Sequence, residues 1–225
     1  HELKGLLGLV GGWLSHIQGH CEHMVRRLQP AHGANGGLIC VKNNRGIPMT
    51  MQTATFGAGC FWCIEAAMNQ LNGVIVALSG YMGGDADSAN YQRVCDGDTG
   101  HAEVVQLQFD DSLISFQQLC LVFFSLHDPT QLNRQGNDVG SQYRSVIFYH
   151  NPEQQRQATE LVAQLNQQQI FSAKLVTEIS AASRFFQAES YHQGYFLHNP
   201  QQAYCQYVVA PKLAKFRQQY AALLK

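Results

Sequence analysis

Two cysteines that enclose two aromatic residues, Cys60-Phe61-Trp62-Cys63, are the sharpest candidate for chemistry in this chain of 225 residues. They follow a β-branched and aromatic segment, residues 53–56, where apolar side chains begin to recur at helical spacing. A thiol at a strand-to-helix turn lies near the unpaired amides of the helix N-terminus, which stabilise a thiolate and lower its pKa. The position therefore predicts that Cys60 is a nucleophile. The rings of Phe61 and Trp62 fit either a core or an apolar pocket beside the thiol.

The Cys-x-x-Cys spacing is also that of a thioredoxin-type redox pair or of half a zinc site. A structural zinc site needs a second pair of ligands, and none of the later cysteines has a Cys or His two to four residues away (Cys95, Cys120 and Cys205). We therefore expect no metal. A thioredoxin-like disulfide oxidoreductase that uses Cys60 and Cys63 stays as the alternative, weakened because no later cis-proline marker follows.

Two polar blocks could complete a site around the thiol. Glu103 opens an otherwise apolar strand after a Gly-rich loop, so burial would raise the pKa of its carboxyl and make it a proton donor. The competing interpretation is a solvated charge at a strand edge. In the long polar loop 127–143, Asp138 either orients a tyrosine or a substrate amide or is only a turn former.

A further block lies near the C-terminus. Glu189, His192 and Tyr195 recur at a spacing typical of a half-buried helix face. Cys205 follows in a glutamine-rich stretch, and we interpret this stretch as mobile enough to bring a second thiol to the first.

The elements that must position these residues alternate between strands and helices. Hydrophobic periodicity and capping signals predict strands at 53–56, 74–79, 105–109, 144–149 and 175–179, and helices at 61–71, 115–126, 151–165 and 211–224. The two long loops between them, 80–102 and 127–143, are of a length that usually carries function.

Composition excludes several classes of protein. Lys and Arg total 15 against 16 Asp and Glu, a net charge of −1, which gives no reason to expect nucleic acid or an anionic membrane as partner. No apolar run approaches the roughly 18 residues of a membrane span. Seven cysteines, an odd number in a chain too large to need disulfides, favour a reducing compartment.

Residues 1–48 differ from the rest, because nine of the 20 glycines and five of the 10 histidines lie there without a helical or strand period. We expect a poorly structured N-terminal extension, with the catalytic domain at 49–225. Met49 and Met51 precede the first convincing strand, which favours the hypothesis that the native protein starts there and that the extension is not part of it. A secretory signal over Leu6–Leu14 is the weaker rival, because glycines interrupt it.

Four stretches occur together in an order and spacing that resemble the A-type peptide methionine sulfoxide reductases. They are GCFWC at 59–63, GDTGHAE at 97–103, HDPTQLNRQGNDVGSQYRS at 127–145 and AExYHQxY at 188–195. The resemblance covers roughly residues 53–211 and is far more specific than any one motif.

The resemblance implies an α+β fold: a two-layer α/β sandwich with a ferredoxin-like α-β plait core around a mixed sheet, long loops and a coiled C-terminal tail. It implies thiol-dependent reduction of methionine S-sulfoxide, protein-bound and free, as a repair of oxidative damage. It also implies a cytoplasmic monomer with no bound cofactor, recycled by thioredoxin, or by dithiothreitol in vitro.

By the same resemblance, the Cys60 thiolate attacks the sulfoxide sulfur and becomes a sulfenic acid. Glu103 is then the acid, and two phenols hold the sulfoxide oxygen, those of Tyr91 and Tyr143. The apolar wall for the S-methyl group consists of Phe61, Trp62 and Tyr204, with supporting or substrate-backbone contacts from Asp138 and His192. Cys205 matches the resolving cysteine that forms a disulfide with Cys60, and Cys63 is an alternative resolver.

Overall fold

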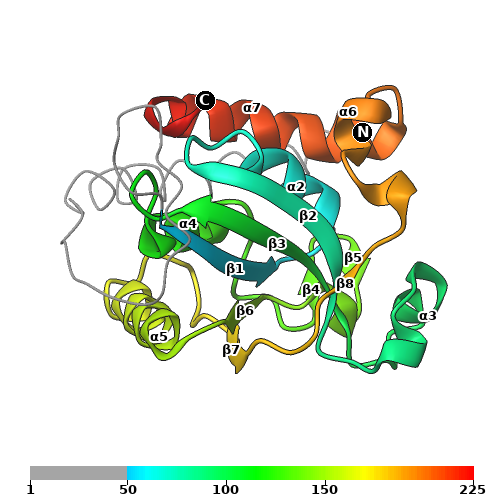
Figure 1. Ribbon diagram of the computed structural model, residues 1–225, viewed down its shortest axis with the longest axis horizontal. Coiled ribbons are helices and arrows are strands. Elements are labelled where there is room, and N and C mark those ends of the chain that lie inside the picture. The colour runs from blue at the N-terminus through cyan, green and yellow to red at the C-terminus, as the bar shows by residue number, and fades with distance from the viewer. Residues whose placement is uncertain (1–49) are drawn as a thin grey trace.

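The computed structural model describes residues 50–225 (Figure 1). The predicted extension at 1–48 lies outside the described residues. Six strands form one sheet in the order β7-β6-β1-β3-β2-β8: Glu178–Ala181, Val146–Tyr149, Met51–Gly57, Ala102–Asp110, Val74–Met82 and Phe186–Gln187. Neighbouring strands are antiparallel except β6 and β7, which run parallel, so the sheet is mixed as predicted.

The four central strands and two crossover helices follow the order β1-α2-β2-β3-α4-β6, where α2 is Phe61–Met68 and α4 is Phe116–Ser125. This β-α-β-β-α-β order is that of a ferredoxin-like plait. Two more helices, α5 (Pro152–Gln167) and α7 (Ala210–Gln219), extend the helical layer. Figure 1 shows α2 and α7 along one side of the sheet and the short helix α3 (Tyr91–Cys95) projecting away from it.

The main core lies between the sheet and the helices. Alternate residues of β1 and β3 face it, among them Phe56, Val105 and Leu107, which are all fully buried. Phe56 stacks on Phe123 of α4 with 5.0 Å between ring centroids. A smaller cluster covers part of the opposite face of the sheet. Burial of one face against helices explains the predicted two-layer architecture.

Local signals in the sequence predicted several element ends correctly. Ser115 and Gln118 form both halves of a capping box at the start of α4. Asn151 caps α5 by accepting a hydrogen bond from the Gln154 amide, with Pro152 in the first turn. The remaining short elements are a hairpin of β4 (Arg134–Gln135) and β5 (Asp138–Val139) and the helical turns η1 (Ala86–Ser88), η2 (Ser141–Tyr143), η3 (Ser190–His192), α6 (Tyr195–His198), η4 (Cys205–Val209) and η5 (Ala221–Leu223).

The prediction of a coiled C-terminal tail was wrong around Cys205. The π-helical turn η4 begins at Cys205 and continues without a break into α7, and the cysteine itself is fully buried. The residues at 189–195 are not one helix either, because Gly194 has a left-handed backbone (φ 62°) that separates η3 from α6. In the described part of the chain, no helix is both long and apolar enough to cross a membrane.

Candidate active site

Cys60 lies at the tight turn between β1 and α2. Gly59 before it has a φ of +76°, which an L side chain rarely adopts, and its amide donates to the carbonyl of Tyr143 at 3.2 Å. A Cβ at Gly59 would stand 2.7 Å from Cβ of Gln135 in the β4–β5 hairpin. Glycine is therefore required here by both backbone and space, and the turn is held against the loop that follows α4.

The pKa of the Cys60 thiol differs from the sequence-based prediction. The Trp62 amide of α2 favours the thiolate, as expected of a helix N-terminus, and so does the Tyr204 hydroxyl. Burial outweighs both and raises the pKa well above its ordinary value, with further increases from the charges of Glu103 and Cys63. The predicted lowering was therefore wrong for the free site, and Cys60 rests as a thiol at neutral pH.

Glu103 lies directly beside this turn. Its side chain shares the inner face of β3 with Val105, is only 3% exposed, and accepts a hydrogen bond from the Phe61 amide at 3.2 Å. Burial raises the pKa of the carboxyl to about 8, helped by the charge of Asp138 and opposed by the Phe61 amide. Most of these carboxyls then keep their proton at pH 7. A buried carboxylic acid thus stands at the helix end that carries the thiol.

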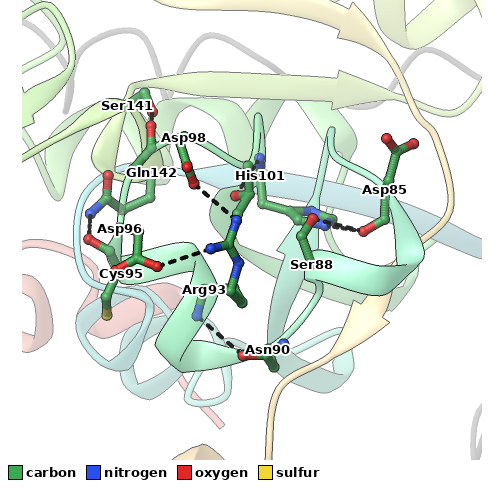
Figure 2. Close-up of polar contacts among 12 residues, drawn as sticks. Asp85, Ser88, Asn90, Arg93, Cys95, Asp96, Asp98, His101, Ser141 and Gln142 are labelled. Atoms are coloured by element: carbon green, nitrogen blue, oxygen red, sulfur yellow. Dashed lines mark hydrogen bonds and ion pairs between the residues drawn. The ribbon is translucent and has the colours of Figure 1, made fainter.

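Two phenols lie on separate elements, α3 and η2, which are joined by hydrogen bonds. Figure 2 shows the residues that make these bonds, among them Cys95, Ser141 and Gln142. Tyr91 begins α3 and Tyr143 ends η2. Gln142 Nε2 donates to the Cys95 carbonyl at 3.3 Å, and Ser141 Oγ donates to the Gly97 carbonyl at 2.8 Å. Burial raises the pKa of both phenols, and the charge of Glu103 raises them further. Both hydroxyls therefore stay protonated and can donate hydrogen bonds, and in the free site that of Tyr91 bonds to the Cys95 side chain.

An aromatic wall stands next to the thiol, and Trp62 is its centre. The indole stacks on Tyr195 with ring centroids 3.7 Å apart and planes within 5°, and Tyr204 meets it edge-on at 5.8 Å. Trp62 Nε1 donates to His192 Nδ1 at 3.1 Å. Trp62, Tyr195 and Tyr204 are partly exposed, whereas Phe61 and His192 are each 1% exposed. The last two therefore support the wall from behind.

Asp138, on strand β5, accepts a hydrogen bond from the Tyr204 hydroxyl at 3.0 Å. The β4–β5 hairpin is thereby connected to the same tyrosine whose hydroxyl favours the Cys60 thiolate. Asp138 is a part of the site because of this contact rather than as a turn former alone.

The other two thiols near the site are buried. Cys63 is 6% exposed and Cys205 is fully buried, and burial raises the pKa of each. The charge of Cys205 acts on Cys63, and the charge of Cys63 acts on Cys60. The three thiols thus form a series from the turn of α2 to the start of η4, in which both Cys63 and Cys205 stay candidates for a bond to Cys60.

Tyr195, which stacks on Trp62, and Glu189, which accepts a hydrogen bond from the Tyr91 amide, were not predicted as site residues. The helical spacing around them was interpreted as one half-buried helix face, whereas Tyr195 follows a left-handed glycine and stacks on Trp62. Their presence in the AExYHQxY stretch was the available signal. Within residues 50–225, no cluster of three His, Cys, Asp or Glu side chains could hold a metal ion.

A cysteine thiol, a protonated carboxyl and phenol donors beside an aromatic wall suit attack by sulfur on an electrophilic atom whose oxygen must be protonated. The family profile described as "Peptide methionine sulfoxide reductase" matches residues 52–224. A protein of Chromobacterium violaceum named "Peptide methionine sulfoxide reductase MsrA" is 53% identical over 175 residues, which is 78% of this chain and 99% of that protein. This chain belongs to the peptide methionine sulfoxide reductase family. As a member it is an oxidoreductase that returns methionine sulfoxide to methionine by thiol chemistry.

Further relatives agree with this membership. A Pasteurella multocida protein with the same name is 49% identical over 174 residues, 77% of this chain and 99% of that protein. The reduced form of Mxr1 from Saccharomyces cerevisiae is similar in structure, with a TM-score of 0.64, 30% identity, and coverage of 74% of this chain and 93% of that one. Methionine sulfoxide reductase A of Corynebacterium diphtheriae has a TM-score of 0.61 and 31% identity, covering 70% of this chain and 79% of that one. The predicted family and the predicted α/β fold around a mixed sheet are confirmed, and the thioredoxin-like alternative is set aside.

Proposed function

We propose that this reductase acts on the S epimer of methionine sulfoxide, protein-bound and free, with Cys60 as nucleophile and Glu103 as proton donor. The observation that carries the assignment is the hydrogen bond from the Phe61 amide to a neutral, buried Glu103 at the helix end that bears Cys60. Such a carboxyl can protonate an oxygen at pH 7, which an ordinary exposed glutamate does rarely.

The proposed step is balanced within the site. The Cys60 sulfur bonds to the sulfoxide sulfur while Glu103 gives its proton to the sulfoxide oxygen, and the carboxylate that remains takes the thiol proton. Transfer of the hydroxyl to the Cys60 sulfur, with cleavage of the new sulfur–sulfur bond, then leaves Cys60 as a sulfenic acid and releases methionine. Tyr91 and Tyr143 hold the oxygen through their hydroxyls, since burial keeps both phenols protonated.

The methyl group of the substrate packs against the exposed part of the aromatic wall, which is Trp62 with Tyr204. Phe61 and His192 hold the indole in place from behind. Asp138 fixes Tyr204 through the phenol hydroxyl. This arrangement supports binding of a small apolar group next to the thiol.

Recycling requires a second thiol. We assign it to Cys205, which condenses with the Cys60 sulfenic acid to a disulfide and releases water, after which the dithiol of thioredoxin reduces that disulfide. Because Cys205 is buried in η4, this step needs the start of η4 to open. Cys63 is nearer along the chain, and a Cys60–Cys63 bond is the competing route.

The proposal also takes the enzyme to act as a monomer with one site per chain. It also places the enzyme in the cytoplasm, which the five free thiols among the described cysteines support. Light scattering tests the first point and cell fractionation the second. A dimer that is required for activity, or recovery in another compartment, would contradict them.

The test is reduction of the two sulfoxide epimers of a blocked methionine, assayed separately with dithiothreitol and with thioredoxin. We expect turnover of the S epimer only, complete loss in Cys60→Ser, and normal turnover in Cys120→Ala, which removes a core thiol of α4. Cys205→Ser should work with dithiothreitol but stop after one turnover with thioredoxin. Consumption of the R epimer, or activity in Cys60→Ser, would overturn the proposal.

A further inference from the structure

Helix α3 carries Tyr91 but cannot position it unaided. It has only five residues, Tyr91–Cys95, and helices of this length are unstable without outside contacts. Figure 1 shows it projecting from the end of β2, away from the sheet. The first-turn amides of a helix have no partner within it, so the contacts that satisfy them determine where the helix begins.

Those first-turn amides have two different partners. The Arg93 amide donates to the side chain of Asn90, the N-cap, at 3.1 Å, which is a contact internal to the α3 segment (Figure 2). The Tyr91 amide donates instead to Oε1 of Glu189 at 2.9 Å, across 98 residues of sequence. This contact fixes the backbone of the residue that bears the phenol.

The Glu189 carboxylate is itself held by a residue of the sheet. Its other oxygen, Oε2, accepts from the hydroxyl of Tyr81, a fully buried residue of β2, at 2.9 Å. Burial opposes ionisation of Glu189, but hydrogen bonds from the Tyr91 amide, its own backbone and the Tyr81 hydroxyl lower its pKa below the ordinary value. His192 Nε2 lies 3.9 Å from Oε2. The carboxylate therefore links the sheet to the first residue of α3.

The segment after Glu189 is also held by hydrogen bonds, so the backbone that carries the carboxylate is fixed. The Gln193 side chain makes three hydrogen bonds: Oε1 accepts from the Ser79 amide, and Nε2 donates to the carbonyls of Ser79 and Ala188. The Gly194 amide donates to Oε1 of Glu65 at 2.9 Å. These bonds attach the segment to β2 and to α2, the helix that begins directly after Cys60.

We propose that Glu189 is a positioning residue for the reaction: it holds the Tyr91 phenol where it meets the sulfoxide oxygen by fixing the Tyr91 backbone against Tyr81. The inference rests on the role proposed above for Tyr91. The proposed role depends on where the Glu189 oxygen lies and not on its charge. An amide oxygen at the same place can accept the hydrogen bond from the Tyr91 amide equally well.

The test is a double-mutant cycle measured as kcat/KM for the S epimer with dithiothreitol. Glu189→Ala should lower kcat/KM by about tenfold or more, because a displacement of about 1 Å in a group that contacts the reacting atoms costs up to about 10²-fold. In the Tyr91→Phe background, Glu189→Ala should lower kcat/KM by less than about twofold more, because no hydroxyl is left to be displaced. Glu189→Gln should stay within about threefold of the wild type.

Two further variants separate positioning from general damage. Asp98→Asn, a matched control, removes an exposed carboxylate that contacts Arg93 on the outer side of α3, and should leave kcat/KM unchanged. If Glu189→Ala does not fold, as judged by circular dichroism, Tyr81→Phe replaces it in the cycle, because it removes only the hydroxyl that holds Glu189.

The outcomes are distinct. Loss of rate in Glu189→Ala that disappears in the Tyr91→Phe background, with recovery in Glu189→Gln, supports the inference. Full activity of Glu189→Ala, or an equal loss in both backgrounds, overturns it while leaving the role of Tyr91 intact. An unchanged rate in Tyr91→Phe alone would instead refute the proposed role of Tyr91, and the inference with it.

Discussion

Replacement of Glu103 by glutamine should raise the stability of the variant relative to the wild type as pH increases. The carboxyl is buried, and its pKa is about 8 in the folded protein against an ordinary value of about 4.5 in the unfolded chain. A folded-state pKa above the unfolded value means that the contribution of this group to stability is full below pH 4.5 and is lost as pH rises through 8. Glutamine cannot ionise in either state, so Glu103→Gln escapes that loss.

The magnitude follows from proton linkage. Between the two pKa values, ionisation of this glutamate stabilises the unfolded state by about 1.4 kcal/mol for each pH unit, whereas it stabilises the folded state little. From pH 5 to pH 7, the free energy of unfolding of Glu103→Gln minus that of the wild type should rise by about 2.5 kcal/mol. Any constant offset from the amide itself cancels in this difference.

The assay is urea unfolding of both proteins at pH 5, 6 and 7. Other titrating groups are common to the pair and cancel as well. The control is Glu153→Gln, whose carboxylate has its pKa lowered to about 2 by Arg156 and is ionised throughout this range, so its difference should stay flat. A flat difference for Glu103→Gln would refute the argument that burial keeps this carboxyl neutral.

Three smaller predictions concern the turn, the thiol and the core. Gly59→Ala should lower kcat while circular dichroism stays native, because of the positive φ and the clash with Gln135; full activity would contradict this. Tyr204→Phe should raise the pKa of Cys60, measured by the pH dependence of alkylation, since its hydroxyl favours the thiolate. Burial lowers the pKa of His127 to about 4, so stability should fall as pH drops from about 6.5 toward 4; His127→Gln should flatten that part of the profile.

The sequence predicted most of the fold because its signals are local. Caps such as Ser115 and Asn151 act within one helical turn, and alternating strands such as β3 show which face is buried. The first helix was predicted to run to residue 71, but α2 ends at Met68. The left-handed Gly73 belongs to the following turn, where a Cβ would meet Ile114 at 2.6 Å, a contact that no local pattern reveals.

The site was predictable only in part, since its energetics depend on burial. Glu103 opens an apolar strand, so its raised pKa follows from sequence. The helix-end argument for Cys60 gave the wrong sign, because burial of that thiol outweighs the contribution of the Trp62 amide. Glu189 was missed for the same reason: its partners, Tyr81 and Tyr91, lie about one hundred residues earlier.

The central claim is that Cys60 receives the sulfoxide oxygen as a sulfenic acid and that Cys205 then forms a disulfide with Cys60. The direct test is to mix the reduced protein with excess S epimer, without reductant, and to count the methionine released and map the disulfide by mass spectrometry. We predict one methionine per chain and a Cys60–Cys205 bond, and in Cys205→Ser one methionine with a sulfenic acid on Cys60. A main Cys60–Cys63 linkage, or no methionine released, would contradict the account.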